Sequence, residues 1–247
     1  MTSAPSRGLQ RGTAAESFER FRLGYPDGVV DRTLAYAEIP VRSAVEVEAG
    51  TGKATRAFAS RGVHVTALEP DGDMFTVLER ETAGMSVEPV LSSFEKYDGP
   101  LVDLVYAAAA WDWTDPLHHW TRAVDLLVDG GVLALFSSPM RVAEPALQTT
   151  IDAVCARSDQ HLQASAGWLH DEMTASDLVV DVEHHVVPRE VVLLQREYIG
   201  FLSTVPDYAE LPMEERQDLL RRIASGLPSQ VLVDATLGLH LARKRPA

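Results

Sequence analysis

The sequence predicts an α/β fold, in which a mostly parallel sheet carries helices on both faces. The first observation is order: between residues 44 and 137, short apolar runs alternate with helix-favouring stretches, as in repeated strand–helix units. The second is composition, because 46% hydrophobic and 23% charged residues are ordinary values for a globular chain. The third is length, since 247 residues fit a single α/β domain. Together these observations exclude a disordered, collagen-like or coiled-coil chain.

The elements of the first half are bounded by clear turns. Ala44 to Glu48 reads as a buried strand that breaks into the turn Ala49-Gly50-Thr51-Gly52 before a helix. Gly62 ends that helix, Pro70-Asp71-Gly72 opens the next, and Asp129-Gly130-Gly131 precedes the fifth strand. We expect five strands, at 44–48, 63–68, 86–91, 102–108 and 131–137. We expect three helices, at 53–61, 72–82 and 116–127. Such alternation means parallel strands joined by helical crossovers.

After Pro139 the pattern changes, which predicts an insertion followed by a C-terminal closure. Helical patterns lie at 144–160, 195–203 and 214–225. Two alternating stretches, 181–194 and 231–243, read as strands, and 161–178 reads as irregular. We therefore expect a flexible N-terminus over 1–15 and one domain over 16–247. Its parts would be a core sheet over about 40–138, an inserted helical cap over about 139–195, and C-terminal helices and strands over about 181–243.

Charge and composition exclude several classes of function. The 36 acidic and 22 basic residues give a formal net charge of −14, so the field of the chain repels nucleic-acid phosphates and anionic lipid. The longest apolar run, Leu104 to Trp111, is far shorter than the roughly 18 residues of a membrane span. Cys155 is the only cysteine, and the histidines show no metal-ligand spacing. The N-terminus has no apolar signal region. We expect a cytoplasmic protein without a metal, a nucleic-acid partner or a membrane partner.

The turn after the first strand is a candidate ligand site. Ligands of open α/β sheets bind beyond the carboxyl ends of the strands, where Gly50 and Gly52 lie, and glycine lets backbone N–H groups approach a ligand closely. Glu69 ends the second strand 69 − 50 = 19 residues after Gly50, near the roughly 20-residue offset of an acid that binds ribose hydroxyls. These features indicate a ribose-containing cofactor; the alternative is a tight connection without a ligand. Thr55 disfavours NAD, because a dinucleotide fingerprint has Gly or Ala there.

Several segments, in order, resemble motifs of the class I S-adenosylmethionine-dependent methyltransferases. VEVEAGTGKAT, residues 45–55, is similar to the first motif, acid-x-Gly-x-Gly-x-Gly, and ALEPDGDM, residues 67–74, resembles the second. SSFEKYD, VDLVYAAAAWDW and LLVDGGVLALF resemble the third, fourth and strand-five motifs. FERFRLGYP, residues 18–26, resembles a segment of the small-molecule branch. The resemblance covers about residues 18–138. It implies a Rossmann-like, doubly wound, mostly parallel seven-stranded sheet, with S-adenosylmethionine as cofactor and S-adenosylhomocysteine as product.

The resemblance also implies roles for individual residues. Glu46 would orient the loop, Gly50 and Gly52 would face the methionine part of the cofactor, and Glu69 would hold the ribose. Met74 and Phe94 would flank adenine, and Ser93 would lie near the adenine amino group. Ala107 and Ala108, at the end of the fourth strand, would lie beneath the sulfonium. The full set of expected cofactor-binding residues is Tyr25, Glu46, Glu48, Ala49, Gly50, Gly52, Glu69, Pro70, Met74, Ser93, Phe94, Ala107 and Ala108.

Two positions depart from the family pattern. Glu48 stands where the family has the first glycine of the loop. Its side chain either turns away, pairs with the cofactor ammonium, or obstructs the methionine tail and repels its carboxylate. In many relatives, residues 110–113 read Ala-Phe-His-Trp, so Trp111 replaces the Phe and Asp112 replaces the His.

The candidate catalytic residue follows the fourth strand. Asp112 lies where an acceptor atom would face the methyl group, and Trp111 and Trp113 would raise its pKa by desolvation or stack on the acceptor. The alternative is that both tryptophans are packing residues and Asp112 caps the next helix. Of His118 and His119, at most one faces the cleft, because adjacent helical residues do not share a face. The expected acceptor-binding residues are Arg22, Trp111, Trp113, His118 and Trp168. Arg22 and Tyr25 would also close over the cofactor as a lid, unless they belong to an ordinary amphipathic helix.

The sequence therefore predicts S-adenosylmethionine-dependent methyl transfer to a small-molecule acceptor, with specialised metabolism as a setting. The first alternative is a protein that keeps the methyltransferase fold but has lost methyl transfer, and binds or converts a small molecule otherwise. The second is an NAD-dependent oxidoreductase.

Overall fold

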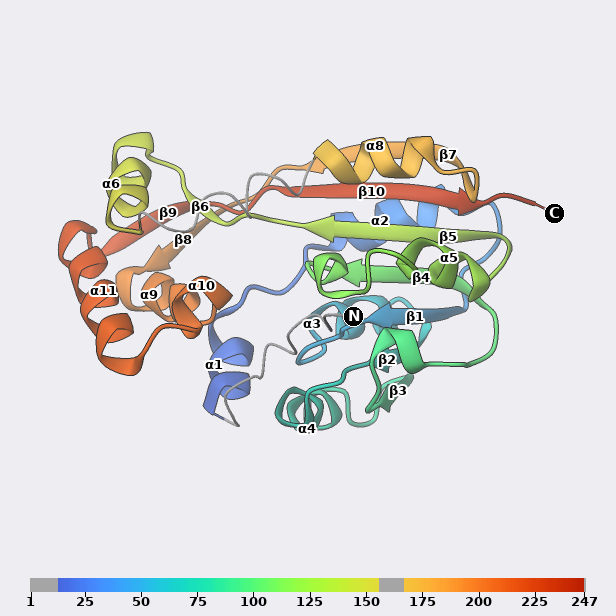
Figure 1. Cartoon of the computed structure of the whole chain (residues 1–247), viewed down its shortest axis with the longest axis horizontal. Coiled ribbons are helices and arrows are strands. Elements are labelled where there is room, and N and C mark those ends of the chain that lie inside the picture. Colours follow the sequence, from blue (N-terminus) through green and yellow to red (C-terminus); the bar gives the residue numbers. More distant parts are fainter. Residues whose placement is uncertain (1–12, 156–166, 247) are drawn as a thin grey trace.

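The main feature of the computed structural model is a seven-stranded sheet of order β3-β2-β1-β4-β5-β10-β7 (Figure 1). The structure describes residues 13–155 and 167–246. β10 runs antiparallel to both of its neighbours, and the other pairs are parallel. The strands are β1 (Ser43–Val47), β2 (His64–Leu68), β3 (Val87–Val90), β4 (Val102–Ala108), β5 (Leu127–Ser137), β7 (Val179–Val187) and β10 (Leu237–Lys244). The predicted fold class is confirmed.

Helices cover both faces of this sheet because its central strands are buried on both sides. β1, β2 and β4 each contain at least four consecutive buried residues. One face packs against α2 (Asp27–Tyr36), α3 (Lys53–Ala59) and α4 (Gly72–Glu81). The other face packs against α5 (His119–Asp125), α8 (Gly167–Ala175) and the short 3-10 helices η1 (Phe94–Lys96) and η2 (Trp111–Trp113). The helix α1 (Thr13–Phe21) lies outside these layers, beside α4.

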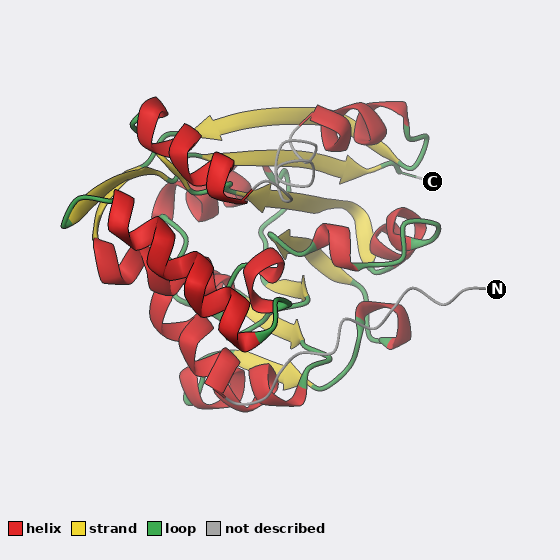
Figure 2. Ribbon diagram, turned by 60° about the vertical axis from the view of Figure 1, so that its left-hand side comes forward, coloured by secondary structure: helices red, strands yellow, loops and turns green. Residues whose placement is uncertain are grey.

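A second, three-stranded sheet of order β6-β9-β8 extends the first (Figure 1). Its strands are β6 (Arg141–Val142), β8 (Glu190–Leu194) and β9 (Gln230–Asp234). β6 follows β5, β8 follows β7 and β9 precedes β10, so three neighbouring strands of the main sheet each continue into the small one. With its helices α6 (Pro145–Cys155), α9 (Gln195–Ser203), α10 (Pro206–Ala209) and α11 (Met213–Gly226), the small sheet shares a separate hydrophobic core. We call this unit, β6 to α6 plus β8 to β9, the cap. Its helices gather at one end of the molecule in Figure 1, and that end is turned toward the viewer in Figure 2.

The expected C-terminal strands differ from the observed ones. The stretch 181–194 is two strands, β7 and β8, interrupted at Pro188 and Arg189, because proline cannot donate a hydrogen bond to a ladder. The stretch 231–243 is likewise divided, at Ala235 and Thr236, into β9 and β10. The cap bounds of 139–195 are therefore wrong in part: β7 belongs to the main sheet, and the cap continues to Asp234.

Four smaller differences concern element ends. The segment 161–178 is not wholly irregular, because 167–175 forms α8 against β7. β5 begins at Leu127, and the expected turn at 129–131 is an irregular part of that strand, where its pairing with β4 shifts register. α5 begins at His119 rather than 116. Residues 13–15, expected to be flexible, belong to α1, whereas 1–12 and the expected helical end 156–160 lie outside the described residues.

Candidate functional site

The turn between β1 and α3 has a left-handed backbone at three positions. The φ angles of Glu48, Gly50 and Gly52 are 52°, 60° and 83°. Gly52 is required sterically, because an added Cβ would lie 2.6 Å from Cδ1 of Leu78. Glu48 adopts a conformation that L side chains rarely take, so the turn carries strain where the family pattern has glycine.

Glu69 closes this turn from the end of β2. Its Oε2 accepts a hydrogen bond of 2.7 Å from the Gly50 N–H, and its Oε1 accepts one of 2.8 Å from the Asp71 N–H. The side chain is only 4% exposed, and burial raises its pKa to about 7 although both N–H groups oppose the rise. Each carboxylate oxygen has a second lone pair, so Glu69 can still accept hydrogen bonds from a ligand.

Glu46 ties the turn to the sheet from below. Its Oε2 accepts hydrogen bonds from the Thr55 hydroxyl on α3 and, at 2.9 Å, from the Tyr106 hydroxyl on β4. Burial raises the pKa of Glu46 to about 8, with the two hydroxyls opposing the rise. Thr55 lies where α3 packs against the sheet, and its hydroxyl donates to Glu46. A dinucleotide fingerprint has a small residue at this contact instead.

Glu48 is turned inward rather than away. Its carboxyl group lies near those of Glu69 and Glu95 and within reach of the Phe94 backbone N–H. Burial, followed by these two acids, raises the pKa of Glu48 to about 8, and the Phe94 N–H opposes the rise. These neighbours favour the inward orientations considered from the sequence over the one that turns away.

The residues expected around adenine lie at the ends of β2 and β3, but with unequal access. Phe94 is fully buried and its ring packs 6.2 Å from that of Trp111, so its backbone rather than its ring faces the site. Met74 is buried against Ala15 and Val77 under α1. Ser93 is half-buried and Pro70 is exposed. The remaining expected positions, in the turn and at the end of β4, are buried or half-buried: Ala49, Ala107 and Ala108.

The segment after β4 differs from the expectation for a desolvated base. Trp111 is 4% exposed and stacks on His119 with ring centroids 4.5 Å apart, whereas Trp113 is 50% exposed. Asp112 is also exposed, so the tryptophans do not desolvate it, and it does not cap α5. Trp111 is therefore a packing residue in this structure.

Of the two adjacent histidines, the inner one is His119. His119 is buried and its Nδ1 lies 2.8 Å from the Thr114 hydroxyl, and burial lowers its pKa to about 4. His118, chosen from the sequence, is exposed, and its Nδ1 lies 2.6 Å from Oδ2 of Asp115. Ala123 lies four residues after His119, on the same face of α5, and is buried. This apolar position is the sequence signal that could have selected His119 rather than His118.

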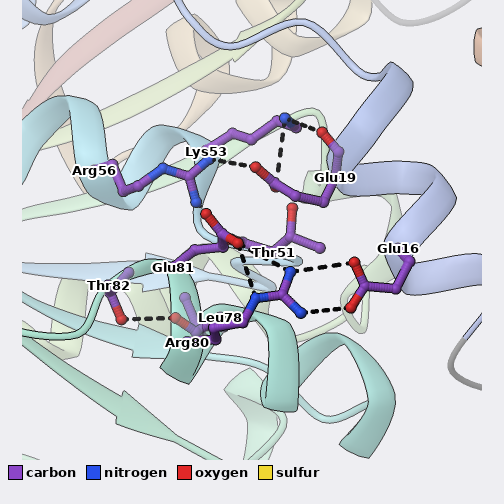
Figure 3. Close-up of polar contacts among 9 residues, drawn as sticks. All are labelled: Glu16, Glu19, Thr51, Lys53, Arg56, Leu78, Arg80, Glu81 and Thr82. Carbon is purple, nitrogen blue, oxygen red and sulfur yellow. Dashed lines mark hydrogen bonds and ion pairs between the residues drawn. The ribbon is translucent and has the colours of Figure 1, made fainter.

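Helix α1 covers the glycine turn, a feature that the sequence did not reveal. The Phe18 ring packs against the turn, because a Cβ added to Gly50 would lie 3.7 Å from the ring. Glu19 pairs with Arg56 at 2.8 Å and with Lys53 at 3.3 Å, and Glu16 pairs with Arg80 of α4 (Figure 3). These acids face the bases of α3 and α4 across the turn, so α1 is fixed over it.

Arg22 and Tyr25 follow α1 and lie between the main sheet and the cap. Nε and Nη2 of Arg22 donate to the hydroxyl and carbonyl of Thr204, at 2.9 and 3.1 Å. Tyr25 packs edge-to-face on Phe136 of β5, with ring centroids 5.0 Å apart, and burial followed by Glu46 raises its pKa. Trp168 is the second residue of α8, and its side chain is not among those that the structure describes.

The donor set fits an adenosine cofactor. Glu69 offers free lone pairs, the turn presents glycine backbone, and the buried Thr51 Oγ1 has no hydrogen-bond partner among the described residues. Within residues 13–155 and 167–246, no group of three or more His, Cys, Asp or Glu side chains could hold a metal ion. The helices of the same residues include none with the length and hydropathy needed to span a bilayer.

Comparisons with known proteins find a similarity to methyltransferases in part of the chain. Residues 45–135 match the family model of the methyltransferase domain. An uncharacterized methyltransferase of Mycobacterium tuberculosis is 34% identical over 129 residues, which are 51% of each chain. The chain thus spans about half the length of the curated relatives it matches first. A Dictyostelium discoideum protein named as a methyltransferase is 24% identical over 228 residues, covering 87% of this chain and 84% of that one.

Solved structures agree on the fold. A type II methyltransferase structure from Anaeromyxobacter dehalogenans superposes with a TM-score of 0.61 at 18% identity, covering 92% of this chain and all of the other. Phosphoethanolamine N-methyltransferase 2 of Haemonchus contortus, with phosphomonomethylethanolamine and S-adenosylhomocysteine bound, gives 0.57 at 15% identity and covers 95% and 57%. Residues 45–135 are therefore similar to a methyltransferase domain, and the chain shares the fold of these solved methyltransferases.

Proposed function

We propose that this protein transfers a methyl group from S-adenosylmethionine to a small-molecule acceptor. The observation that carries the proposal is Glu69, which holds the Gly50 turn closed while keeping acceptor capacity at the carboxyl edge of β1 and β2. The similarity of residues 45–135 to a methyltransferase domain and the glycine turn support the same cofactor. The small size of the acceptor is supported by relatives such as phosphoethanolamine N-methyltransferase, whose name gives a small substrate.

In this proposal the chain mainly binds the cofactor and orients it toward the acceptor. Bound S-adenosylmethionine supplies an electrophilic methyl group on a sulfonium. Glu69 accepts hydrogen bonds from the ribose, the backbone of Ala49 to Gly52 lies along the methionine part, and Ala107 and Ala108 leave room at the end of β4. The remaining cofactor contacts are assigned to Tyr25, Met74, Ser93 and the Phe94 backbone, while Glu46 orients the turn from below. Methyl transfer is an in-line displacement, so alignment and exclusion of water are the main demands on the protein.

The acceptor would enter between the end of β4 and the cap. Asp112 is the proposed base for an acceptor that must lose a proton, because it follows β4 at that edge; an acceptor with a free lone pair would not require it. Arg22 and Trp113 are the proposed acceptor contacts, because Arg22 bonds the cap at Thr204 and Trp113 exposes half of its side chain. We propose that the cap selects the acceptor.

One observation favours a second candidate, a methyltransferase fold reused for another purpose. Glu48 is turned inward near the Phe94 N–H and adds a carboxyl group to a site that already contains Glu69. If that side chain fills the place of the cofactor, methyl transfer is lost while the fold remains.

A thermal-shift comparison tests the two candidates. A ligand that binds only the folded chain raises its melting temperature by mass action. We expect S-adenosylmethionine and S-adenosylhomocysteine to raise the melting temperature and NAD to leave it unchanged. No shift with either adenosyl compound, confirmed by calorimetry, would contradict methyl transfer and favour the reused fold. A shift with NAD alone would favour an oxidoreductase.

A further inference from the structure

Three histidines from three elements meet on one face of the main sheet. His240 lies on β10, His184 is its partner on β7, and His170 lies on α8, which packs against both strands (Figure 1). The rings of His184 and His240 stack with their centroids 4.4 Å apart, and the His170 ring lies 6.2 Å from each of them. We call these three residues the histidine cluster. They are separate from the residues assigned to the cofactor and the acceptor.

The cluster accommodates neutral rings. His240 is 2% exposed, and the Nδ1 atoms of His240 and His170 are buried without a hydrogen-bond partner among the described residues. A neutral imidazole with its proton on Nε2 leaves Nδ1 bare, whereas a protonated imidazole has an N–H group on both nitrogens. Protonation of either ring would therefore create a buried donor that no described residue accepts, which costs free energy.

The surroundings of His240 act in the same direction. Its neighbour on β5 is the apolar Leu135. Nε2 of His184 and Nε2 of His240 both lie beside Gly238, because a Cβ added there would be 3.6 and 3.9 Å from them. Protonation of both rings would thus place two like charges close together. Burial, followed by His184 and His170, lowers the pKa of His240 to about 4.

The acids of β7 and α8 do not compensate a charge on the cluster. Glu183 lies on the opposite face of β7, because adjacent strand residues alternate, and its carboxylate is 2.7 Å from Nε2 of His185. On α8, Glu172 accepts a hydrogen bond of 3.0 Å from Nε1 of Trp120, and Asp171 is exposed. None of these acids is among the groups that shift the pKa of His240.

Falling pH therefore favours a state in which the cluster is apart. In a detached segment His240 gains its proton near pH 6.5, whereas in the packed cluster it stays neutral down to about pH 4. Between these values the detached state binds more protons, so acid shifts the equilibrium toward it. We propose that the histidine cluster is a pH-sensitive latch, which holds α8 and β7 against β10 at neutral pH and loosens them in mild acid.

Loosening of this latch would reach the cap. β7 continues into β8, so it is one of the three strands that join the main sheet to the cap. α8 also contributes Leu169 and Met173 to the core of the main sheet, and these apolar contacts remain when the rings gain protons. The latch therefore changes how often α8 opens and leaves the rest of the chain folded. This inference does not depend on methyl transfer.

Amide hydrogen exchange measures this opening. The protection factor, which corrects for the pH dependence of intrinsic exchange, is compared for residues 167–175 at neutral and mildly acidic pH. One proton taken up on opening should lower the protection about tenfold between about pH 7.5 and 5.5. Residues 43–47 of β1 are the internal reference. Glu46 cannot produce the same result, because its raised pKa makes the folded chain more stable in acid.

Three variants test the histidines themselves. His240→Leu removes the buried titrating ring, so the protection of residues 167–175 should become equal at the two pH values. His185→Gln, on the opposite face of β7, is the control and should behave as the wild type. His184→Gln changes the exposed member of the cluster and keeps the test open if His240→Leu does not fold. In His184→Gln the pKa of His240, measured from its ring protons by NMR, should be higher than in the wild type, because one like charge is gone.

Four results would overturn the proposal. In the first, the wild type shows the same protection of residues 167–175 at both pH values. In the second, the protection falls equally in the wild type and in His240→Leu, which assigns the effect to other groups. In the third, residues 43–47 lose protection to the same extent, which means that the chain unfolds as a whole. In the fourth, the pKa of His240 is the same in His184→Gln as in the wild type.

Discussion

Three glutamates at the carboxyl edge of the sheet show how one residue type takes different roles. Glu46 is bonded only to hydroxyls of the fold, at Thr55 and Tyr106, and so organises the turn. Glu69 is bonded to backbone N–H groups and keeps lone pairs toward the edge. Glu48 lies near Glu69 and the Phe94 N–H, on a strained backbone. Burial raises the pKa of all three, so the protonation of this edge depends on pH near neutrality.

Replacing Glu69 tests the cofactor site directly. Glu69→Ala removes a charge-assisted ribose contact and should weaken S-adenosylhomocysteine binding by about 1.5 to 3 kcal/mol, which is about tenfold to a hundredfold. Because the variant also leaves the Gly50 and Asp71 N–H groups without their acceptor, Glu69→Gln is the milder companion. Calorimetry measures both, with Glu88→Ala on the exposed side of β3 as control. Equal affinity in the Glu69 variants and the control would remove Glu69 from the site.

Replacing Glu48 distinguishes a working site from an obstructed one. Glu48→Gly relieves the left-handed strain and should raise the free energy of unfolding by about 1 kcal/mol. We expect binding of S-adenosylhomocysteine to be neutral or weaker, since the inward carboxyl group is expected to contact the cofactor ammonium. Urea unfolding and calorimetry measure the two effects. A large gain in affinity, together with no detectable binding by the wild type, would show that Glu48 obstructs the site.

At the scale of elements, local patterns predicted the first half of the chain and failed where tertiary contacts decide. The strand β1, the turn and the strand β2 follow from buried runs and glycines, so Gly50, Glu46 and Glu69 could be placed from sequence. The stretches 181–194 and 231–243 alternate in sequence through their interruptions, although β9 is buried on one face and β10 on both. Alternation alone cannot show that a strand changes sheets.

The acceptor side was harder to predict for a related reason. Asp112 was expected to be desolvated by its neighbours in sequence, but exposure depends on what packs above the loop, and nothing in the described chain covers it enough to bury it. Phe18, Glu19 and Thr204 could not be found because their contacts join segments distant in sequence. The pairing of Arg22 with Thr204, for instance, spans 182 positions.

Helix α1 gives a prediction at this scale. The ion pairs of Glu16 and Glu19 fix α1 over the turn, so the double variant Glu16→Gln and Glu19→Gln should loosen it (Figure 3). Partly exposed pairs contribute only about 0.2 to 1 kcal/mol each, so global stability should change little. Hydrogen exchange of residues 13–21 should become faster, and S-adenosylhomocysteine should slow it again. Asp218→Asn, which breaks an exposed pair with Arg221 on α11, is the control. Unchanged exchange in α1 would mean that apolar contacts such as Phe18 hold the helix alone.

For the whole molecule, the buried glutamates link stability to pH. Glu46 holds its proton in the folded chain up to about pH 8, whereas an ordinary glutamate releases it near 4.5. Between these values the folded state binds more protons than the unfolded state, so the free energy of unfolding falls as the pH rises. We expect a loss of at least about 1 kcal/mol between pH 5 and 8, measured by urea unfolding.

The net charge of −14 acts in the same direction, because self-repulsion of the compact chain grows as acids ionise. Two controls separate the causes. Added salt screens the surface repulsion but leaves the effect of a buried group largely intact. Glu46→Gln, which can still accept from Thr55 and Tyr106, should flatten the pH dependence, whereas Glu88→Gln should not. A profile that is equally steep in both variants would assign the effect to net charge.

The continuation of β5, β7 and β10 into β6, β8 and β9 also determines how the two sheets can move. A unit joined to its neighbour by one or two flexible segments can swing as on a hinge. Here three adjacent strands connect the sheets, and the strand order is the same on both sides of the gap. Such a ribbon resists bending within its own plane but tolerates a change of twist. The cap should therefore open and close by torsion of this ribbon, with the largest displacement at α11 and α6, farthest from the shared strands.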